Sequence, residues 1–319
     1  MRAWSARWPR RTVAAIALCA VCVACEAATP PPAALAPGEH VVVMDDGVRV
    51  VYHVAGRGPV CLVHPGGPGM AWSYLRMPLL EAQLTLVYVE PAGTGASSSL
   101  DSVPRTLVRR HAEDLEAVRR ALGLKRVCVI GHSYGGGVAM RYAIEHGEHL
   151  AALVLYGTSA VTDAEWGKDS DAAEQSFAGE PWFARVEATL KTPLPEPAFA
   201  HECTRLTRLA PFYFADYTRR HHELDAAVRG WRCWARPVEL AKEKLDDLRP
   251  ELGELRAPTL VITGQRDWLF GPKWAEVTAD AILDARVVVL AHSGHFGHLE
   301  EPSAFAQAVG AFVRGAMGR

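Results

Sequence analysis

Residues 131–135 read Gly-His-Ser-Tyr-Gly, a G-x-S-x-G pattern that sets the hydroxyl of Ser133 between two glycines. The pattern follows the apolar run at residues 127–130 and precedes a helical pattern, and this is the strand-to-helix turn in which it has a mechanical meaning. Because so tight a turn brings neighbouring backbone close together, glycines at 131 and 135 avoid clashes that side chains would create. The sequence therefore predicts that Ser133 is displayed at the end of a strand as a nucleophile.

A serine hydroxyl needs a base to take its proton, and the base needs a carboxylate to fix its tautomer. Asp267 and His295 follow later apolar runs in the required order of acid and then histidine. Alternatives for each are a helix cap at Asp267, a structural role for His295, and His292 or His298 as the base. Zinc binding by the three histidines is a further alternative, although no H-E-x-x-H pattern accompanies them. The order and the positions at strand ends favour the triad Ser133, Asp267 and His295.

Acyl transfer also needs N–H donors for the oxyanion that develops in the transition state. One expected donor is the backbone N–H of Tyr134, the residue after the nucleophile. The other is expected from the loop His-Pro-Gly-Gly-Pro-Gly at residues 64–69. Since proline has no N–H, either Gly67 or Gly66 must donate.

The surrounding pattern indicates the elements that must position these residues. Short apolar runs that do not alternate are typical of strands covered on both faces of a mostly parallel sheet. They lie at residues 60–63, 84–89, 127–130, 153–156, 260–262 and 287–290. Helical patterns separate them, for example at residues 107–122, and residues 39–56 alternate around Asp46-Gly47, a hairpin signal. We therefore predict an α/β fold, with a mostly parallel sheet flanked by helices.

The alternation of strand and helix breaks between residues 161 and 250, a stretch rich in aromatic residues, histidine and arginine. This stretch is too long for a loop, and we predict a helical cap, with an unrelated second domain as the alternative. The predicted organisation is an export signal at 1–24, a Pro/Ala-rich linker at 25–38, the first part of the core at 39–160, the cap at 161–250 and the second part of the core at 251–319.

The first residues indicate export. Four arginines precede an apolar run at residues 13–24, which is too short to cross a bilayer but fits a cleaved signal. Cys22-Val-Ala-Cys25 is similar to a lipoprotein cleavage box, so we expect a periplasmic protein that is either lipid-anchored at Cys25 or soluble, or one that is secreted. In an oxidising compartment Cys203 and Cys233 are candidates for a disulfide, whereas Cys61 and Cys128 are expected to be small buried hydrophobes.

The composition excludes some classes of function. The chain has 319 residues with 34 basic and 36 acidic side chains, and this balance argues against nucleic acid as a partner. The pattern implies no metal or organic cofactor. The oligomeric state cannot be inferred from the sequence.

The segments HPGGPG, VEPAGTGASS, GHSYGGGVAMRYA, GQRD and SGHF together resemble the proline iminopeptidase group of the α/β-hydrolase superfamily, whose oxyanion loop carries H-G-G-P-G. The resemblance spans residues 41–319 and implies an α/β-hydrolase fold, with Ser133 as nucleophile, Asp267 as acid, His295 as base, and Gly67 with Tyr134 as oxyanion donors. Two departures concern the substrate. Proline stands where the family's histidine would align, and Glu-Pro-Ala-Gly at residues 90–93 replaces Asp-Gln-Arg-Gly.

The resemblance implies a serine hydrolase that releases N-terminal proline, or a similar residue, from short peptides. Recognition of the free amine needs carboxylates in the cap, for which Glu202 and Glu223 are our candidates beside Asp216 and Asp225. Candidates for an apolar pocket are Phe212, Tyr213, Trp231 and Trp234. The alternatives are a carboxylesterase or lactonase that acts on small esters, and an exported binding module without activity; a serine at residue 133 disfavours chemistry that needs an aspartate nucleophile.

Overall fold

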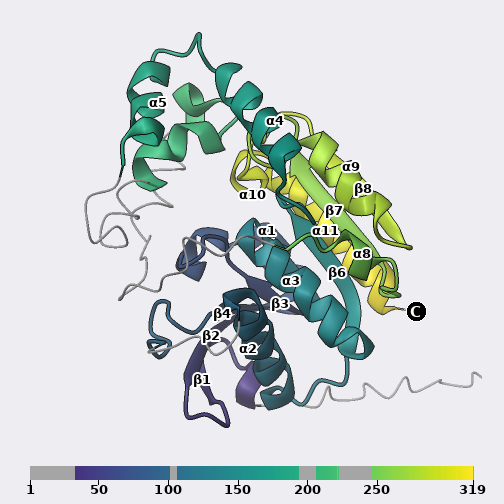
Figure 1. Cartoon of the computed structure of the whole chain (residues 1–319). Coiled ribbons are helices and arrows are strands. Elements are labelled where there is room, and N and C mark those ends of the chain that lie inside the picture. The colour runs from purple at the N-terminus through teal and green to yellow at the C-terminus, as the bar shows by residue number, and fades with distance from the viewer. Residues whose placement is uncertain (1–32, 101–105, 194–205, 221, 223–245, 319) are drawn as a thin grey trace, which may run out of the picture. The chain divides into compact units, whose positions relative to one another are not determined.

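The computed structural model describes residues 33–100, 106–193, 206–220, 222 and 246–318 (Figure 1). The predicted leader, the possible lipid anchor at Cys25, the pair Cys203 and Cys233, and the cap residues Glu202 and Glu223 lie outside the described residues. Predictions for these positions therefore stay predictions. Within the described ranges no helix is long and apolar enough to cross a membrane.

The described residues form one sheet of eight strands in the order β1-β2-β4-β3-β5-β6-β7-β8. β1 pairs with β2, and β2 with β4, in antiparallel fashion, and all other neighbours are parallel. The strands are β1 Gly38–Val43, β2 Arg49–Gly56, β3 Val60–His64, β4 Thr85–Glu90, β5 Val127–His132, β6 Leu150–Tyr156, β7 Thr259–Gly264 and β8 Ala285–Leu290. The predicted α/β class with a mostly parallel sheet is confirmed.

The predicted hairpin is also confirmed. β1 and β2 pair up to Val43 opposite Arg49, and the backbone N–H of Met44 donates to the carbonyl of Val48 at 2.8 Å. Gly47 has a φ of 83° in the turn between them, a left-handed conformation that favours glycine.

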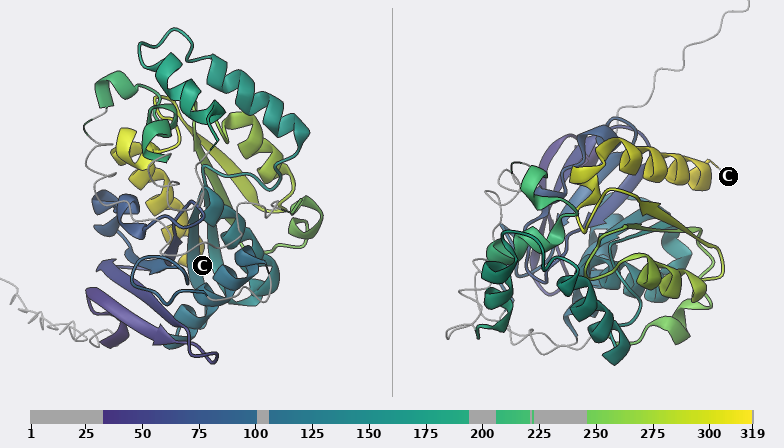
Figure 2. Two further views of the ribbon diagram at one scale, coloured as in Figure 1. Left: turned by 60° about the vertical axis from the view of Figure 1, so that its left-hand side comes forward. Right: turned by 90° about the horizontal axis from the view of Figure 1, so that it is seen from above.

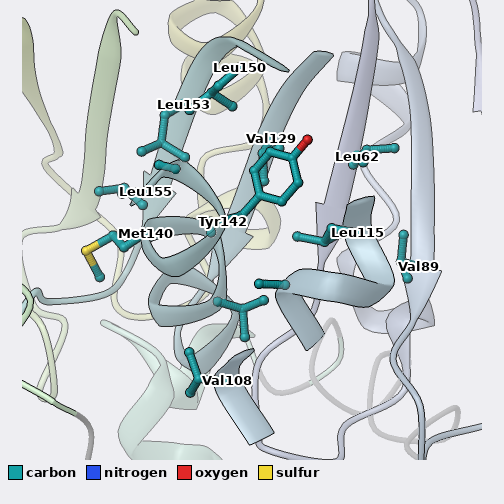
Figure 3. Packing of buried hydrophobic residues seen from close by; sticks show 14 of the residues in the cluster. Leu62, Val89, Val108, Leu115, Val129, Met140, Tyr142, Leu150, Leu153 and Leu155 are labelled. Atoms are coloured by element: carbon teal, nitrogen blue, oxygen red, sulfur yellow. The ribbon is translucent and has the colours of Figure 1, made fainter. Parts of the chain in front are cut away.

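Helices cover both faces of the sheet (Figure 1, Figure 2). One core lies between the sheet and α2, α3, α8 and α9, and a second core includes residues of α1 and α11. Figure 3 shows part of the first core, where Leu115 and Tyr142 lie near Val129. Every residue of β4, β5 and β7 is buried, which explains why their sequences do not alternate. The helices bounding these cores are α1 Pro78–Glu81, α2 Leu107–Ala121, α3 Tyr134–Glu145, α8 Arg249–Leu252, α9 Pro272–Asp280, α10 Gly297–Glu300 and α11 Pro302–Met317, with the 3-10 turns η1 Ala33–Leu35, η2 Trp72–Leu75 and η3 Gly147–His149.

Between β6 and β7 the described elements include α4 (Ala164–Gln175), α5 (Phe183–Lys191) and the 3-10 turn η4 (Ala210–Tyr213), followed by α8. β6 nevertheless pairs directly with β7, so the intervening segment interrupts one continuous sheet. A cluster of buried aromatic residues joins these helices to Trp268, the neighbour of Asp267. The limits 161 and 250 for a helical cap remain a prediction, because part of that stretch lies outside the described residues.

Candidate active site

Ser133 lies at the junction of β5 and α3, with a φ of 55° and a ψ of −122°. It is the one non-glycine residue with a positive φ in the part of the chain that the structure describes. Its backbone N–H donates to the carbonyl of Tyr156 in β6 at 2.9 Å, which holds the turn against the sheet. A conformation of this kind costs about 1–3 kcal/mol and persists only where its surroundings determine it.

The flanking glycines allow this turn to form, as the sequence predicts. A Cβ on Gly131 would collide with the carbonyl oxygen of Gly135. A Cβ on Gly135 would collide with the carbonyl oxygens of His64 and Pro65, at the start of the predicted oxyanion loop. The glycines therefore let β5, α3 and this loop approach one another at the serine.

Asp267 and His295, which lie far apart in the sequence, form a buried pair. The Nδ1 atom of His295 lies 2.8 Å from Oδ2 of Asp267, and both residues are buried. The other carboxylate oxygen of Asp267, Oδ1, accepts hydrogen bonds from the backbone N–H groups of Leu269 and Phe270, both at 3.0 Å. Since a carboxylate accepts, Nδ1 carries the ring proton and Nε2 of the neutral ring is an acceptor, the tautomer that a general base requires.

The alternative role of Asp267 as a helix cap does not describe its position, because the residue that caps α9 is Gly271. The backbone of His295 is fixed as well, since its N–H donates to the carbonyl of Tyr213 at 2.8 Å.

Ser133, His295 and Gly67 line one cavity of about 80 Å³. Among the described residues no hydrogen bond joins the Ser133 hydroxyl to the His295 ring. The predicted nucleophile and base thus line the same pocket, but the hydrogen bond between them is not formed. Such contacts are often long in enzymes without substrate and shorten when substrate binds.

The loop at residues 64–69 lies against the nucleophile, since a Cβ on Gly66 would be 3.0 Å from that of Ser133. The N–H of Gly66 donates to the hydroxyl of Tyr74 at 2.7 Å, which leaves Gly67 as the better candidate donor. Gly67 has a φ of 125°, a conformation that favours glycine. Tyr134 is the first residue of α3, so its N–H belongs to the positive end of the helix dipole.

The rival histidines occupy other environments. Both ring nitrogens of His298 are engaged, Nδ1 with the hydroxyl of Tyr156 at 2.9 Å and Nε2 with the carbonyl of Tyr74 at 2.8 Å. Burial lowers the pKa of His298 to about 4. His292 lines a separate surface pocket, and the described residues contain no group of three or more His, Cys, Asp or Glu suited to a metal ion. Of the three histidines, His295 is the one that shares a cavity with Ser133.

The residues predicted to bind substrate lie in different environments. Tyr213 lines the cavity, whereas Phe212 is buried among other aromatic side chains. Asp216 forms an ion pair with Arg219 at 3.5 Å and lies on the other surface pocket. Asp225, Trp231 and Trp234 lie outside the described residues, as do Glu202 and Glu223. The cysteines Cys61 and Cys128 are buried free thiols in neighbouring strands, as predicted.

Several residues of the cavity carry no signal in the sequence. Its apolar wall consists of Met70, Leu206, Leu269 and Phe296, beside Tyr74 and His132. They come from separate segments of the sequence, among them η2 and the end of β5, that meet only in the folded chain. His132 and Phe296 lie inside motifs, G-x-S-x-G and Ser-Gly-His-Phe, but neither motif indicates that these side chains line a cavity.

Glu300 holds the loop that carries His295. Its carboxylate accepts hydrogen bonds from the backbone N–H of Gly294 at 2.6 Å and from that of Ala215 at 2.9 Å. Burial raises the pKa of this carboxyl to about 7, against the opposing effect of its N–H donors. The side chain thus connects the base loop to the segment that follows η4.

Comparison with known proteins agrees with the fold. Residues 59–302 match the model of the α/β hydrolase fold family. The chain is 28% identical over 282 residues to the 2-hydroxymuconate semialdehyde hydrolase of Pseudomonas sp. strain CF600, covering 84% of this chain and 91% of that protein. It is 24% identical over 281 residues to the proline iminopeptidase PfmaB of Pestalotiopsis fici, covering 80% and 92%.

Solved structures are similar in fold. A thermophilic esterase from Thermogutta terrifontis has a TM-score of 0.66 at 23% identity, covering 87% of this chain and 98% of the esterase. The proline iminopeptidase of Mycobacterium smegmatis has a TM-score of 0.62 at 24% identity, covering 88% and 98%. Because the family model matches most of the chain, the protein belongs to the α/β hydrolase fold family.

Proposed function

We propose that the protein is a serine hydrolase that acts through an acyl-enzyme, with Ser133 as nucleophile, His295 as general base and Asp267 as the acid that orients it. The observation that carries the proposal is the strained Ser133 in one cavity with a His295 ring whose Nδ1 is bound to Asp267 at 2.8 Å. Membership in a hydrolase fold family supports it.

In the proposed reaction, the Ser133 hydroxyl attacks a substrate carbonyl carbon while Nε2 of His295 takes its proton. The N–H groups of Gly67 and Tyr134 bind the oxygen that becomes negative, and Asp267 stabilises the imidazolium. His295 then gives the proton to the leaving group, and the acyl group remains on Ser133. Water attacks this ester with His295 again as the base, which releases the acid and restores the serine.

For the substrate, we propose a carboxylic ester with a small, uncharged acyl group. The cavity of about 80 Å³ has a mainly apolar wall, and no carboxylate side chain is among the described residues that line it. An engineered cavity of about 150 Å³ holds benzene, so a short acyl chain fits this space better than an aromatic one. This ranks an ester ahead of the prolyl peptide that the sequence resemblance favours.

Release of N-terminal proline is the second candidate. The His-Pro-Gly-Gly-Pro-Gly loop supports it, as does the similarity to relatives that are named proline iminopeptidases. It requires a partner for the substrate ammonium, and Glu202 and Glu223 are the candidates.

The test is to measure hydrolysis of p-nitrophenyl acetate, butyrate and octanoate beside prolyl and alanyl p-nitroanilides, with Ser133→Ala as the control. The proposal expects turnover of the short esters that disappears in the variant. Cleavage of the anilides without ester turnover would replace the ester by the peptide, and activity that survives in Ser133→Ala would reject the serine mechanism.

A further inference from the structure

A chain of hydrogen bonds connects the predicted oxyanion loop to the loop of the predicted base. The N–H of Gly66 lies 2.7 Å from the hydroxyl of Tyr74, in η2. The same hydroxyl lies 2.8 Å from Nδ1 of His132, the last residue of β5 and the neighbour of Ser133. The Nε2 atom of His132 lies 3.1 Å from the backbone carbonyl oxygen of His295.

The partners fix the direction of every bond in this chain. A carbonyl oxygen only accepts, so Nε2 of His132 carries the proton and donates to His295. In a neutral ring Nδ1 is then an acceptor, and the Tyr74 hydroxyl donates to it. The oxygen of that hydroxyl in turn accepts from the N–H of Gly66. Every hydrogen bond in the series therefore joins one donor to one acceptor.

Burial supports these protonation states. Tyr74 is 3% exposed and His132 is 2% exposed. Burial, followed by the nearby His295 and His298, lowers the pKa of His132 well below its ordinary value, which keeps the ring neutral. Burial also raises the pKa of the Tyr74 phenol, so it remains a donor.

Ring contacts also hold the side chains of this hydrogen-bonded series in position. The Tyr74 and His132 rings meet edge to face, with centroids 5.6 Å apart. The His132 and His295 rings lie with their centroids 4.6 Å apart. A second chain runs beside the first, because the Tyr156 hydroxyl bonds to Nδ1 of His298 and Nε2 of His298 donates to the carbonyl of Tyr74. The carbonyl of Tyr74 is thus tied to His298 in α10, and its phenol is tied through His132 to the backbone of His295.

We propose that Tyr74 and His132 are positioning residues that hold the N–H of Gly67 and the ring of His295 at fixed places about Ser133. The proposal rests on the proposed function of this site. The loop at residues 66–67 consists of glycines, which have no side chains with which to anchor themselves. The bond from Gly66 to Tyr74 supplies that anchor one residue before the donor.

The expected effect follows from the geometry of the transition state. Displacement of a catalytic group by about 1 Å costs on the order of 100-fold in rate, and loss of one oxyanion donor costs about 100- to 1,000-fold in kcat. Tyr74→Phe removes the acceptor of Gly66 and the donor to His132 but keeps the ring. We expect kcat to fall about 10- to 100-fold with KM changed less than about three-fold, because the donor acts mainly in the transition state.

Tyr88→Phe is the matched control. The Tyr88 hydroxyl also accepts from a backbone N–H, that of Met77 at 3.1 Å, and donates to Glu81 at 2.8 Å. Its side chain is buried in the same core as that of Tyr74, but its hydrogen bonds lead away from the cavity. We expect a similar loss of stability with kcat unchanged, and equal kcat values for the two variants would overturn the proposal.

Variants of His132 provide a rescue test. The side-chain amide of His132→Gln can still donate to the carbonyl of His295, whereas His132→Leu keeps only the bulk. The proposal expects His132→Gln to retain several-fold more kcat than His132→Leu, measured on folded protein. Equal rates in the two variants would show that the ring acts only by filling space.

Amide hydrogen exchange separates this inference from the proposed function. In Tyr74→Phe the N–H of Gly66 loses its acceptor and should exchange at least about ten-fold faster than in the wild type, while Tyr88→Phe leaves it protected. Unchanged exchange would contradict the chain of hydrogen bonds. A wild-type protein with protected Gly66 but no turnover and no labelling by a fluorophosphonate would contradict the serine hydrolase function instead.

Discussion

Gly157 lies directly against the ring of His295: a methyl group on its α-carbon would be 3.1 Å from Nδ1 of that ring and 3.2 Å from Oδ2 of Asp267. Gly157 follows β6, and its N–H donates to the carbonyl of Ile262 in β7 at 2.9 Å. Its φ is 53°, so the backbone also favours glycine. The absence of a side chain at this position gives Asp267 and His295 room to meet.

Gly157→Ala should therefore lower kcat, because the new methyl group must push apart a pair whose geometry sets the direction of Nε2. We expect a loss of about 10-fold, smaller than the roughly 100-fold that follows a displacement of about 1 Å, because the pair must move by only a few tenths of an ångström. Gly167→Ala, in α4 with open space around the position, is the control and should leave kcat unchanged. Wild-type kinetics in Gly157→Ala would mean that the pair does not control the rate.

Asp267→Asn tests the assigned tautomer. The amide nitrogen of asparagine would face Nδ1 of His295 and make that atom an acceptor, so Nε2 would carry the proton and could not take one from Ser133. The same exchange in a serine protease lowers kcat about 10,000-fold, and we expect a loss of at least about 1,000-fold here. The oxygen that remains can still accept from the N–H groups of Leu269 and Phe270. Thermal unfolding checks that the variant folds, and a loss below ten-fold in folded protein would contradict the role of Asp267.

The apolar wall of the cavity should determine which acyl chain lengths the enzyme prefers. Met70→Ala enlarges the cavity, so the ratio of kcat/KM for p-nitrophenyl octanoate over acetate should rise by about ten-fold or more. Met140→Ala also truncates a buried methionine, but in the core between the sheet and its helices. That control should lose stability, by about 2–5 kcal/mol, with the ratio unchanged. The same shift in both variants would count against Met70 as part of the acyl pocket.

Buried histidines should make the fold sensitive to acid. Burial lowers the pKa values of His64 and His298 to about 4, from an ordinary value of 6.5. Between these values these two histidines bind more protons in the unfolded chain than in the folded one, so their contribution to stability is complete above pH 6.5 and falls as the pH drops toward 4. Urea unfolding at several pH values should show this slope, and His298→Gln should make it shallower. A slope that is the same in the variant would exclude His298 as a contributor.

The sequence predicted the structure correctly where a short local pattern determines the backbone conformation. The G-x-S-x-G motif determines a turn that only small neighbours permit, and the clashes around Gly131 and Gly135 have this cause. Runs of apolar residues predicted β4, β5 and β7, because strands that are covered on both faces have no polar side, and every residue of these strands is buried. That Asp267 and His295 meet could be predicted, because each follows a strand that ends at the same edge of the sheet.

The remaining parts of the site depend on contacts between distant segments. Tyr74 and Leu269 reach the cavity from loops whose own sequences resemble ordinary turns, and nothing local distinguishes them from structural residues. The residues alone left Gly67 and Gly66 both open; the family resemblance favoured Gly67, and the bond from Gly66 to Tyr74 supports that choice. Gly157 could not be identified either, because its importance comes from the pair that packs against it.

The most direct test of the account is to locate the covalent adduct that a fluorophosphonate forms with the purified protein. The probe reacts with a serine only when a base activates the hydroxyl, so peptide mapping by mass spectrometry reports on the nucleophile itself. The account predicts one adduct, on Ser133, which is absent from Ser133→Ala and formed more slowly by Asp267→Asn. An adduct on another residue, or no adduct on folded wild-type protein, would contradict it.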